Sequence, residues 1–385
     1  MKKNKTEKVI PGKHGVVCNN GKDPFGYFGW PTVARMEDGE LVVAASGLRT
    51  WHVDPYGKTV VFRSSDDGTT WKGPTIVGQT PIDNRDGGVT PLGGSKLLCS
   101  WFTSDTRKAV DKIGKYYLKN VGGEEQLTKW QETFATWTDE MVAKWLGSWI
   151  SVSDDGKQWS DPIRVPVSAP HGPIKLRNGS LLYLGNSLPP LDGKITAACS
   201  LDDGHTWTVL GTVKNTRSVL KEAFCEPHVI ELPSGKLLGL MRYQYEGTGF
   251  FTHDCLPEKD YDQRPEMNMS MWQTESLDGG QTWKDAWPLN VRGLPPHLLR
   301  HSSGALICTY GYRHKPPSHR VMISRDDGKT WDSDHVLRRA LDNDGDIGYG
   351  SSVELSNGEI FTVYYQKPTK DEKASLLSTQ WRLPS

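Results

Sequence analysis

The stretch Ser324-Arg325-Asp326-Asp327-Gly328-Lys329-Thr330-Trp331 decides the fold, because its pattern recurs along the chain. The pattern is Ser-x-Asp-x-Gly-x-x-Trp. Further copies read SSDDGTTW at 64–71, SLDDGHTW at 200–207 and SLDGGQTW at 276–283, and a fifth, VSDDGKQW at 152–159, has Val in place of Ser. Such recurrence in a chain of 385 residues indicates an internal repeat, which sets the architecture before any local pattern does.

Each copy predicts a tight turn followed by a packing residue. The Asp side chain can accept a hydrogen bond from the backbone two residues on, and Gly supplies the positive φ that closes the turn. The Trp then buries a large ring between neighbouring units. We therefore expect the copies to be scaffold and to make no contact with a substrate.

A second repeat lies out of phase with the first and reads as two apolar strands joined by a turn at a Gly. Its six copies start at Pro31, Gly87, Gly172, Pro227, Pro296 and Gly350. In five units a third strand leads into the Asp-containing turn and a fourth follows its Trp. The pattern predicts an all-β, six-bladed β-propeller of four-stranded blades. In the sixth blade we expect the third strand at 376–381 and the fourth near 7–17, which would close the ring.

Two inserts interrupt this regular spacing, both between the second and third strands of a blade. The insert at about 103–147 has an amphipathic pattern and is predicted to be helical, whereas the insert at about 246–269 is polar and is predicted to be a loop. Loops at this place open on the face opposite the repeated turns, so both inserts are expected to overhang the functional face. Residues 1–385 are predicted to form one domain.

The composition excludes several functions. Lys plus Arg equals Asp plus Glu, 46 each, so no charge excess favours nucleic acid or an anionic membrane. The six cysteines are scattered, which favours free thiols over disulfides or a zinc site, and we expect no metal and no cofactor. The basic N-terminus lacks an apolar core and no run reaches membrane-spanning length. The sequence thus predicts a soluble protein, cytoplasmic as it stands, and secreted or periplasmic if a signal peptide has been removed.

Polar and aromatic residues gather where the innermost strands begin and the second strands end. They include Asp86, His171, Glu226, His297 and Tyr349 at the beginnings, and Arg49, His52, Asp54, Arg242 and Arg313 at or just beyond the ends. In a propeller these positions converge on the central axis. Charged groups facing a shared cavity usually bind or transform a polar molecule.

These motifs resemble the sialidase superfamily, whose six-bladed propellers carry Asp-box repeats. Arg49 and Asp54 match the spacing of the family's Arg and its Asp acid/base. Glu226 and Arg242 match its Glu and the Arg sixteen residues later, through CEPHVIELPSGKLLGLMR. Arg313 matches an Arg after the second strand of blade five, and Tyr349 precedes Ser351-Ser352 where the family has its Tyr nucleophile.

The resemblance implies an exo-acting, retaining glycoside hydrolase on an acidic glycan that bears sialic or uronic acid. Tyr349 would attack the anomeric carbon, Glu226 would take its proton, and Asp54 would act as acid/base. Arg49, Arg242 and Arg313 are predicted to bind the substrate, together with Asp86 and the four histidines His52, His171, His228 and His297. The expected partner is a glycan or oligosaccharide.

This chain also departs from the family pattern. At the position of the Arg in the family's Arg-Ile-Pro motif it has Gly29, and Tyr349 stands one place early. The family does not explain the four histidines. Two alternatives therefore stay open: a carbohydrate-binding propeller without catalysis, and a polysaccharide lyase in which a His and Tyr349 move protons beside a carboxylate neutralised by Arg.

Overall fold

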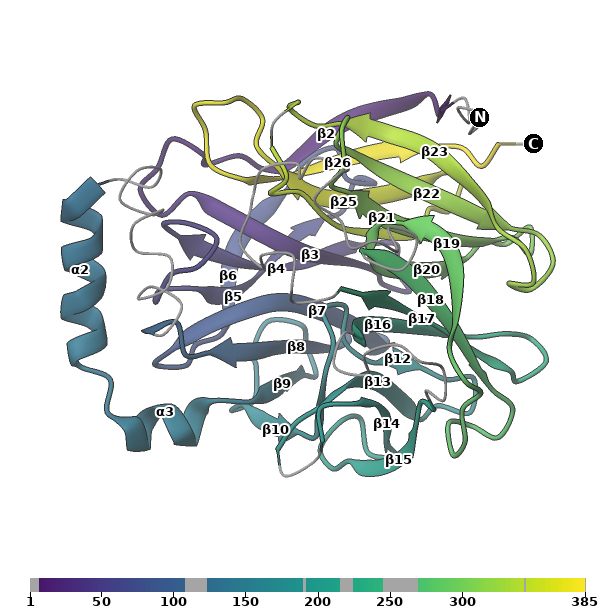
Figure 1. The fold of residues 1–385 in the computed structure, drawn as a ribbon, viewed down its shortest axis with the longest axis horizontal. Coiled ribbons are helices and arrows are strands. Elements are labelled where there is room, and N and C mark those ends of the chain that lie inside the picture. Colours follow the sequence, from purple (N-terminus) through teal and green to yellow (C-terminus); the bar gives the residue numbers. More distant parts are fainter. Residues whose placement is uncertain are drawn as a thin grey trace, which may run out of the picture.

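The computed structural model describes residues 7–107, 123–189, 192–214, 224–244, 269–342 and 344–384. Six β-sheets stand in a ring, and the first strand of each sheet lies innermost (Figure 1). The prediction of an all-β, six-bladed propeller with four-stranded blades is therefore confirmed. Five blades follow the chain outward from the axis, and the N-terminal segment supplies the outermost strand of the sixth; neighbouring strands pair antiparallel.

The first three blades run from the inside out as follows. Blade one is β3 (Tyr27–Arg35), β4 (Leu41–Arg49), β5 (Lys58–Ser64) and β6 (Lys72–Gly78). Blade two is β7 (Asp83–Gly93), β8 (Lys96–Ser104), β9 (Ser148–Ser153) and β10 (Ile163–Val165). Blade three is β12 (Ile174–Lys175), β13 (Leu181–Ser187), β14 (Ile195–Ser200) and β15 (Thr208–Thr212), with β11 (Val167–Ser168) also pairing with β13.

The other three blades complete the ring. Blade four is β16 (Phe224–Glu231), β17 (Leu237–Tyr243), β18 (Ser270–Ser276) and β19 (Trp287–Arg292). Blade five is β20 (Leu294–Arg300), β21 (Leu306–Tyr312), β22 (Ser318–Ser324) and β23 (Asp332–Arg339). Blade six is β24 (Gly348–Glu354), β25 (Ile360–Gln366), β26 (Ser375–Trp381) and β2 (Gly12–Cys18).

The ring closes as predicted, with the N-terminal segment supplying the outer strand of blade six. Strand β2 pairs antiparallel with β26, with Gly12 opposite Trp381. The segment does more than expected, because β1 (Lys8–Val9) pairs parallel with β23 at the edge of blade five. The N-terminus therefore covers the outer edges of two blades, which removes strand edges that could pair with another chain.

The repeated turns connect the third and fourth strands, as predicted. In the copy at 324–331, Ser324 Oγ accepts the Gly328 N–H at 2.9 Å, and Asp326 accepts hydrogen bonds from both the N–H and the hydroxyl of Thr330. The Thr330 hydrogen bonds lower the pKa of Asp326 to about 2, so its carboxylate stays ionised. The copy at 152–159 differs, because its turn uses Asp155 instead of Asp154 as the acceptor for the following N–H groups.

The Trp of each turn packs in a core between neighbouring blades. Trp71 of blade one lies 5.7 Å from the ring of Phe361 in blade six, and Trp283 is buried in a cluster shared by blades three and four. The apolar core is therefore divided into sectors between adjacent sheets.

The first insert is helical where the structure describes it, as predicted. Helix α2 (Gly123–Ala135) and helix α3 (Asp139–Trp145) lie at one edge of the propeller (Figure 1). Trp130 of α2 packs on Val53 in the loop after β4, and both side chains are buried. The second insert lies outside the described residues, apart from Met269.

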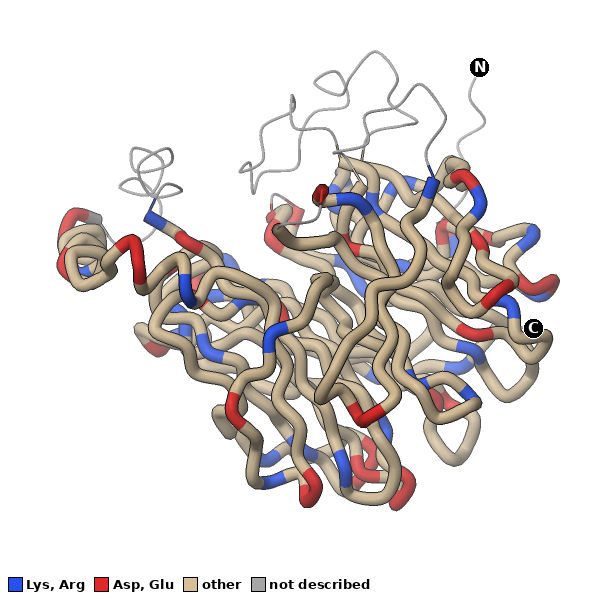
Figure 2. Tube along the Cα trace, turned by 90° about the horizontal axis from the view of Figure 1, so that it is seen from below, with Lys and Arg blue, Asp and Glu red and all other residues tan. Residues whose placement is uncertain are grey.

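Charged residues of both signs are intermingled along the side of the molecule seen in Figure 2. The described cysteines, Cys18, Cys99, Cys199, Cys225 and Cys308, are free thiols. Neither described helix is long and apolar enough to cross a membrane.

Candidate active site

Bulges in the innermost strands present the candidate residues at one level around the axis. In five blades the pairing register shifts, so that two consecutive residues of the first strand lie opposite a single residue of the second strand. These pairs are 30–31 in β3, 86–87 in β7, 226–227 in β16, 295–296 in β20 and 349–350 in β24. A bulge re-aims a side chain, and such bulges are common beside active sites.

The first bulge residue has a left-handed backbone in four of these blades. The φ angles are 55° at Trp30, 58° at Asp86, 49° at Glu226 and 52° at Tyr349. Non-glycine residues adopt this conformation at a cost, and it clusters at functional sites. The bulge also accounts for the position of Tyr349 one place early in the sequence. Tyr349 and Gly350 together lie opposite one residue of β25, so the pairing is regular again at Ser351.

Tyr349, Glu226 and Arg242 form one hydrogen-bonded chain. The Tyr349 hydroxyl donates to Glu226 Oε1 at 2.5 Å, and Arg242 Nη1 donates to Glu226 Oε2 at 2.5 Å. Arg242 also donates to Gln244. The side chains come from β24, β16 and β17, so two blades on opposite sides of blade five meet here. A phenol that donates to a carboxylate held by a guanidinium can pass its proton to that carboxylate.

Electrostatics keep Tyr349 protonated. Burial raises the pKa of Tyr349 well above its usual range, the negative charges of Glu226 and Asp86 raise it further, and Arg242 and Arg313 oppose them. The hydroxyl therefore needs a base to become a nucleophile, and Glu226 accepts its hydrogen bond.

Arg313 lies on the other side of Tyr349. Its Cζ is 6.0 Å from the centre of the Tyr349 ring, its Nε donates to the Ile347 carbonyl at 2.9 Å, and its Nη2 donates to the Tyr365 hydroxyl at 3.3 Å. The structure thus brings Arg242 and Arg313 to Tyr349, and their binding of a substrate stays a prediction.

At Gly29, which stands where the family has the Arg of its Arg-Ile-Pro motif, neighbouring side chains leave little room for a larger residue. A Cβ on Gly29 would lie 3.2 Å from Tyr27 Cε1 and 3.6 Å from Tyr365 Cδ2, so the two tyrosines fill the space.

A cavity of about 490 Å³ opens beside Glu226. Asp86 and Glu226 supply its carboxylates, and Phe102, Leu146, Pro170 and Leu188 are among its apolar walls. Ala143 and Leu146, from α3 and its C-cap, form one side, so the helical insert borders this cavity. A concave, mostly apolar site with a few polar groups suits a small-molecule ligand.

Narrowing this cavity from α3 is expected to weaken substrate binding. Ala143→Trp places a large side chain at the cavity wall, and we expect KM to rise about tenfold, equivalent to about 1.4 kcal/mol of binding, with a smaller change in kcat. Ala143 is exposed, so the unfolding temperature should change little. Ala135→Trp is the matched control, because Ala135 is also exposed and helical but does not line the cavity. Equal KM values for the two variants would contradict this use of the cavity.

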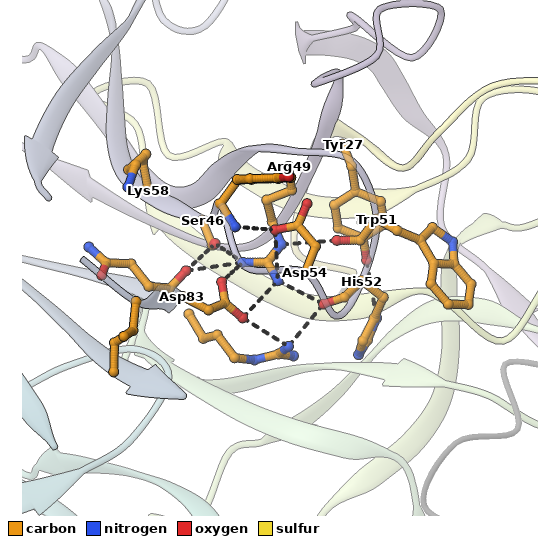
Figure 3. Close-up of polar contacts among 12 residues, drawn as sticks. Tyr27, Ser46, Arg49, Trp51, His52, Asp54, Lys58 and Asp83 are labelled. Atoms are coloured by element: carbon orange, nitrogen blue, oxygen red, sulfur yellow. Dashed lines mark hydrogen bonds and ion pairs between the residues drawn. The ribbon is translucent and has the colours of Figure 1, made fainter. Parts of the chain in front are cut away.

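Arg49 lies apart from that cavity, buried in an ion pair (Figure 3). Its guanidinium is bidentate to Asp83, at 2.5 Å and 3.1 Å, and it also donates to the carbonyls of Trp51 and His52. Its side chain is 0% exposed. This geometry makes Arg49 an anchor for the loop after β4, and its role in substrate binding stays a prediction.

Asp54 lies in that same loop, beneath α2. Its Oδ2 accepts the Thr50 N–H at 2.5 Å and the Thr50 hydroxyl at 2.7 Å, and its Oδ1 accepts the Tyr56 N–H at 2.9 Å. The side chain is 0% exposed. The carboxylate is therefore the acceptor of a closed turn, and its predicted role as acid/base stays a prediction.

His52 joins a buried polar cluster that includes two tyrosines which sequence reasoning missed. Asp346 accepts hydrogen bonds from Tyr27 at 3.0 Å and Tyr365 at 3.1 Å, and His52 Nδ1 lies 2.8 Å from it. Trp30 packs against His52 at 4.8 Å. Tyr27 and Tyr365 sit in apolar strand patterns, so only the strand register could have shown that their hydroxyls meet Asp346.

The other three histidines form a cluster on the axis and link the blades. His228 Nδ1 accepts the Leu298 N–H at 3.0 Å, His297 Nδ1 accepts the Ser352 N–H at 3.3 Å, and His171 Nδ1 lies 2.9 Å from Thr32 Oγ1. Burial lowers the pKa of all three, that of His228 to about 3, so they are neutral. Within the described ranges, no group of three or more His, Cys, Asp or Glu side chains could hold a metal ion. Substrate binding by these histidines stays a prediction.

No protein-family model matches the sequence, and no curated protein matches it. Among solved structures, a protein of unknown function from Dyadobacter fermentans is similar with a TM-score of 0.72 at 20% identity, over 97% of this chain and 98% of that chain. A Hadza microbial sialidase has a TM-score of 0.62 at 17% identity, over 97% of this chain and 68% of its own. The intramolecular trans-sialidase from Ruminococcus gnavus has a TM-score of 0.59 at 14% identity, over 96% and 97%.

The chain has the fold of the sialidases. At these sequence identities the similarity to sialidases establishes the fold and does not establish the activity. The activity has to be argued from the residues at the axis.

Proposed function

We propose that the protein is a retaining, exo-acting glycoside hydrolase of sialidase type that acts on a glycan bearing a carboxylate sugar. The observation that carries the proposal is the Tyr349–Glu226–Arg242 chain, with its 2.5 Å contacts, beside a cavity of about 490 Å³. Tyrosine nucleophiles are the sialidase exception among glycosidases. A neutral phenol avoids placing a second carboxylate against an anionic sugar.

In the proposed reaction, Tyr349 Oη bonds to the anomeric carbon as the glycosidic C–O bond breaks. The phenolic proton passes to Glu226, and an acid protonates the leaving oxygen. Water then reverses the sequence and releases the sugar with its configuration retained. Arg313, and Arg242 where it is not held by Glu226, would attract the substrate carboxylate. With Gly29 at the place of the family's first Arg, two guanidinium groups take part instead of three.

Covalent trapping tests this proposal directly. The protein is first assayed on methylumbelliferyl glycosides of sialic acid, uronic acids and neutral hexoses. A fluorinated analogue of the sugar that is cleaved should then label the peptide that carries Tyr349, as seen by mass spectrometry. An unsaturated product with ultraviolet absorbance would indicate a lyase instead, and glycan binding without turnover would indicate a binding module.

A further inference from the structure

Asp86 is a buried carboxylate at the wall of the cavity. It is the first bulge residue of β7, with a φ of 58°, and therefore stands at the level of Glu226 and Tyr349. Its side chain lines the same cavity as Glu226 and the residue is 6% exposed. Within the described part of the chain, no hydrogen bond or ion pair reaches its carboxylate. Desolvating such a group costs free energy, so its persistence points to a role in the cavity.

Asp54 provides the contrast. Among the described residues, its hydrogen bonds come from Thr50 and Tyr56 within its own loop, and Trp130 of α2 packs on Val53 of that loop. Asp54 is not among the residues that line the cavity. A general acid must come within hydrogen-bond reach of the oxygen that it protonates. Asp86 lines the cavity beside Glu226, which accepts the Tyr349 hydrogen bond, whereas Asp54 does not line it.

The charges around Asp86 suit an acid that works near neutral pH. The groups whose charge acts on its pKa are Glu226 on β16, Arg242 on β17, Arg49 on β4 and Arg85 on β7. The charge of Asp86 acts in turn on Tyr349 on β24, and Arg164 on β10 lines the same cavity. Burial and then the charge of Glu226 raise the pKa of Asp86 to about 7, against the opposing charges of Arg85, Arg49 and Arg242. Arg242 pairs with Glu226 and favours its ionised form, which suits a base, whereas the raised pKa of Asp86 suits an acid.

We propose, building on the glycoside-hydrolase function above, that Asp86 is the general acid and base of this site in place of Asp54. As the bond from the anomeric carbon to the leaving oxygen breaks, its electron pair stays on that oxygen, which takes the Asp86 proton. In the second step the Asp86 carboxylate takes a proton from water, and the water oxygen bonds to the anomeric carbon. Tyr349 Oη leaves and regains its proton from Glu226.

Leaving-group dependence distinguishes an acid from a structural residue. Asp86→Asn and Asp54→Asn are compared on the dinitrophenyl and phenyl glycosides of the sugar that the wild type cleaves. The dinitrophenyl group leaves without a proton, whereas phenol needs one. For Asp86→Asn we expect kcat/KM to fall about 10²–10⁴-fold on the phenyl glycoside and less than tenfold on the dinitrophenyl glycoside. Added azide should restore turnover of the dinitrophenyl substrate as the glycosyl azide.

The pH profile gives a second signature. An acid must be protonated to act, so wild-type activity should fall as the pH rises through about 7, and Asp86→Asn should lose that decline. The variant should also stay folded. The raised pKa means that ionised Asp86 destabilises the native state at alkaline pH, so the unfolding temperature of Asp86→Asn there should be no lower than that of the wild type.

Each other outcome decides against the proposal in a different way. Equal losses of Asp86→Asn on both substrates, with an unchanged pH profile, would show that Asp86 is not the acid. The leaving-group signature in Asp54→Asn would assign the acid to Asp54 and leave the hydrolase function standing. A wild type that cleaves no glycoside, or that is not labelled at Tyr349, would overturn the proposed function and this inference together.

Discussion

Replacing Tyr349 with Phe is expected to lower kcat on the order of 10³-fold or more, because the substitution removes only the nucleophilic oxygen. The ring would keep its packing against Trp30 at 6.4 Å and Tyr365 at 6.0 Å, so the fold should persist. Initial rates on an aryl glycoside at saturating substrate, with the unfolding temperature measured alongside, would check the prediction.

Tyr364→Phe is the matched control. Its hydroxyl is also buried in blade six, where it donates to the Ser378 carbonyl at 3.1 Å, but it lies outside the Tyr349 chain. That variant should lose about 1 kcal/mol of stability and keep its activity. If Tyr349→Phe retained more than a tenth of the wild-type kcat, the assigned nucleophile would be wrong.

Replacing Glu226 with Gln is expected to lower kcat about as much as Tyr349→Phe does, if the two residues act as one unit. The amide cannot take the phenolic proton, so kcat should fall steeply. The double variant should then lose little more than the worse single variant, as for other residues that act together. Additive losses would mean that Glu226 serves the substrate independently of Tyr349.

The propeller could be predicted from sequence because its information is local and repeated. Each turn at Ser324–Trp331 and its relatives is specified within eight residues, through a Ser that caps the Gly N–H and an Asp that accepts from the Thr. Periodic apolar strands on either side then fix how many blades there are. Even the closure by the N-terminus followed, because the sixth blade lacked one strand.

The sequence could not show that the Tyr349 hydroxyl meets Glu226. The spacing of Tyr349 is one residue away from the family pattern, and only the two-for-one pairing of β24 with β25 shows that a bulge absorbs Gly350. Register is a property of two strands together. The same kind of bulge in β7 carries Asp86 to the cavity. The sequence placed Asp86 among the candidates at the axis but gave no sign that a bulge positions it.

Arg49 and Asp54 show a second limit of reasoning from spacing. Their spacing fits the family, yet the side chains are closed off by segments distant in sequence. Trp130 of the helical insert packs over the loop, and Tyr56 contacts Thr133 across 77 residues. Asp83, which neutralises Arg49, starts the next blade. Spacing along a chain carries no information about which later segment will cover a loop.

Replacing Arg49 with Met is expected to destabilise the protein by about 3–5 kcal/mol, because it removes the nearest cation from the buried carboxylates of Asp83 and Asp54. Asp83 keeps the more distant Arg85, at 3.8 Å. Both carboxylate side chains are 0% exposed, and Arg49 lies 2.5 Å from Asp83 and 3.9 Å from Asp54. The loss should appear as a lower urea midpoint at neutral pH. The double variant Arg49→Met/Asp83→Asn should recover part of it, since the strongest unpaired charge is then removed.

Lys129→Met on α2 is the control for Arg49→Met, because it removes a cation from an ion pair that is exposed and not buried. Lys129 pairs with Glu125 at 2.7 Å, but both side chains are exposed, so the loss should stay below about 0.5 kcal/mol. Activity separates the two roles open to Arg49. An anchor that holds the carbonyls of Trp51 and His52 would, when removed, lower stability and kcat together. A substrate ligand would instead raise KM with the free energy of unfolding unchanged, and that result would return Arg49 to the binding site.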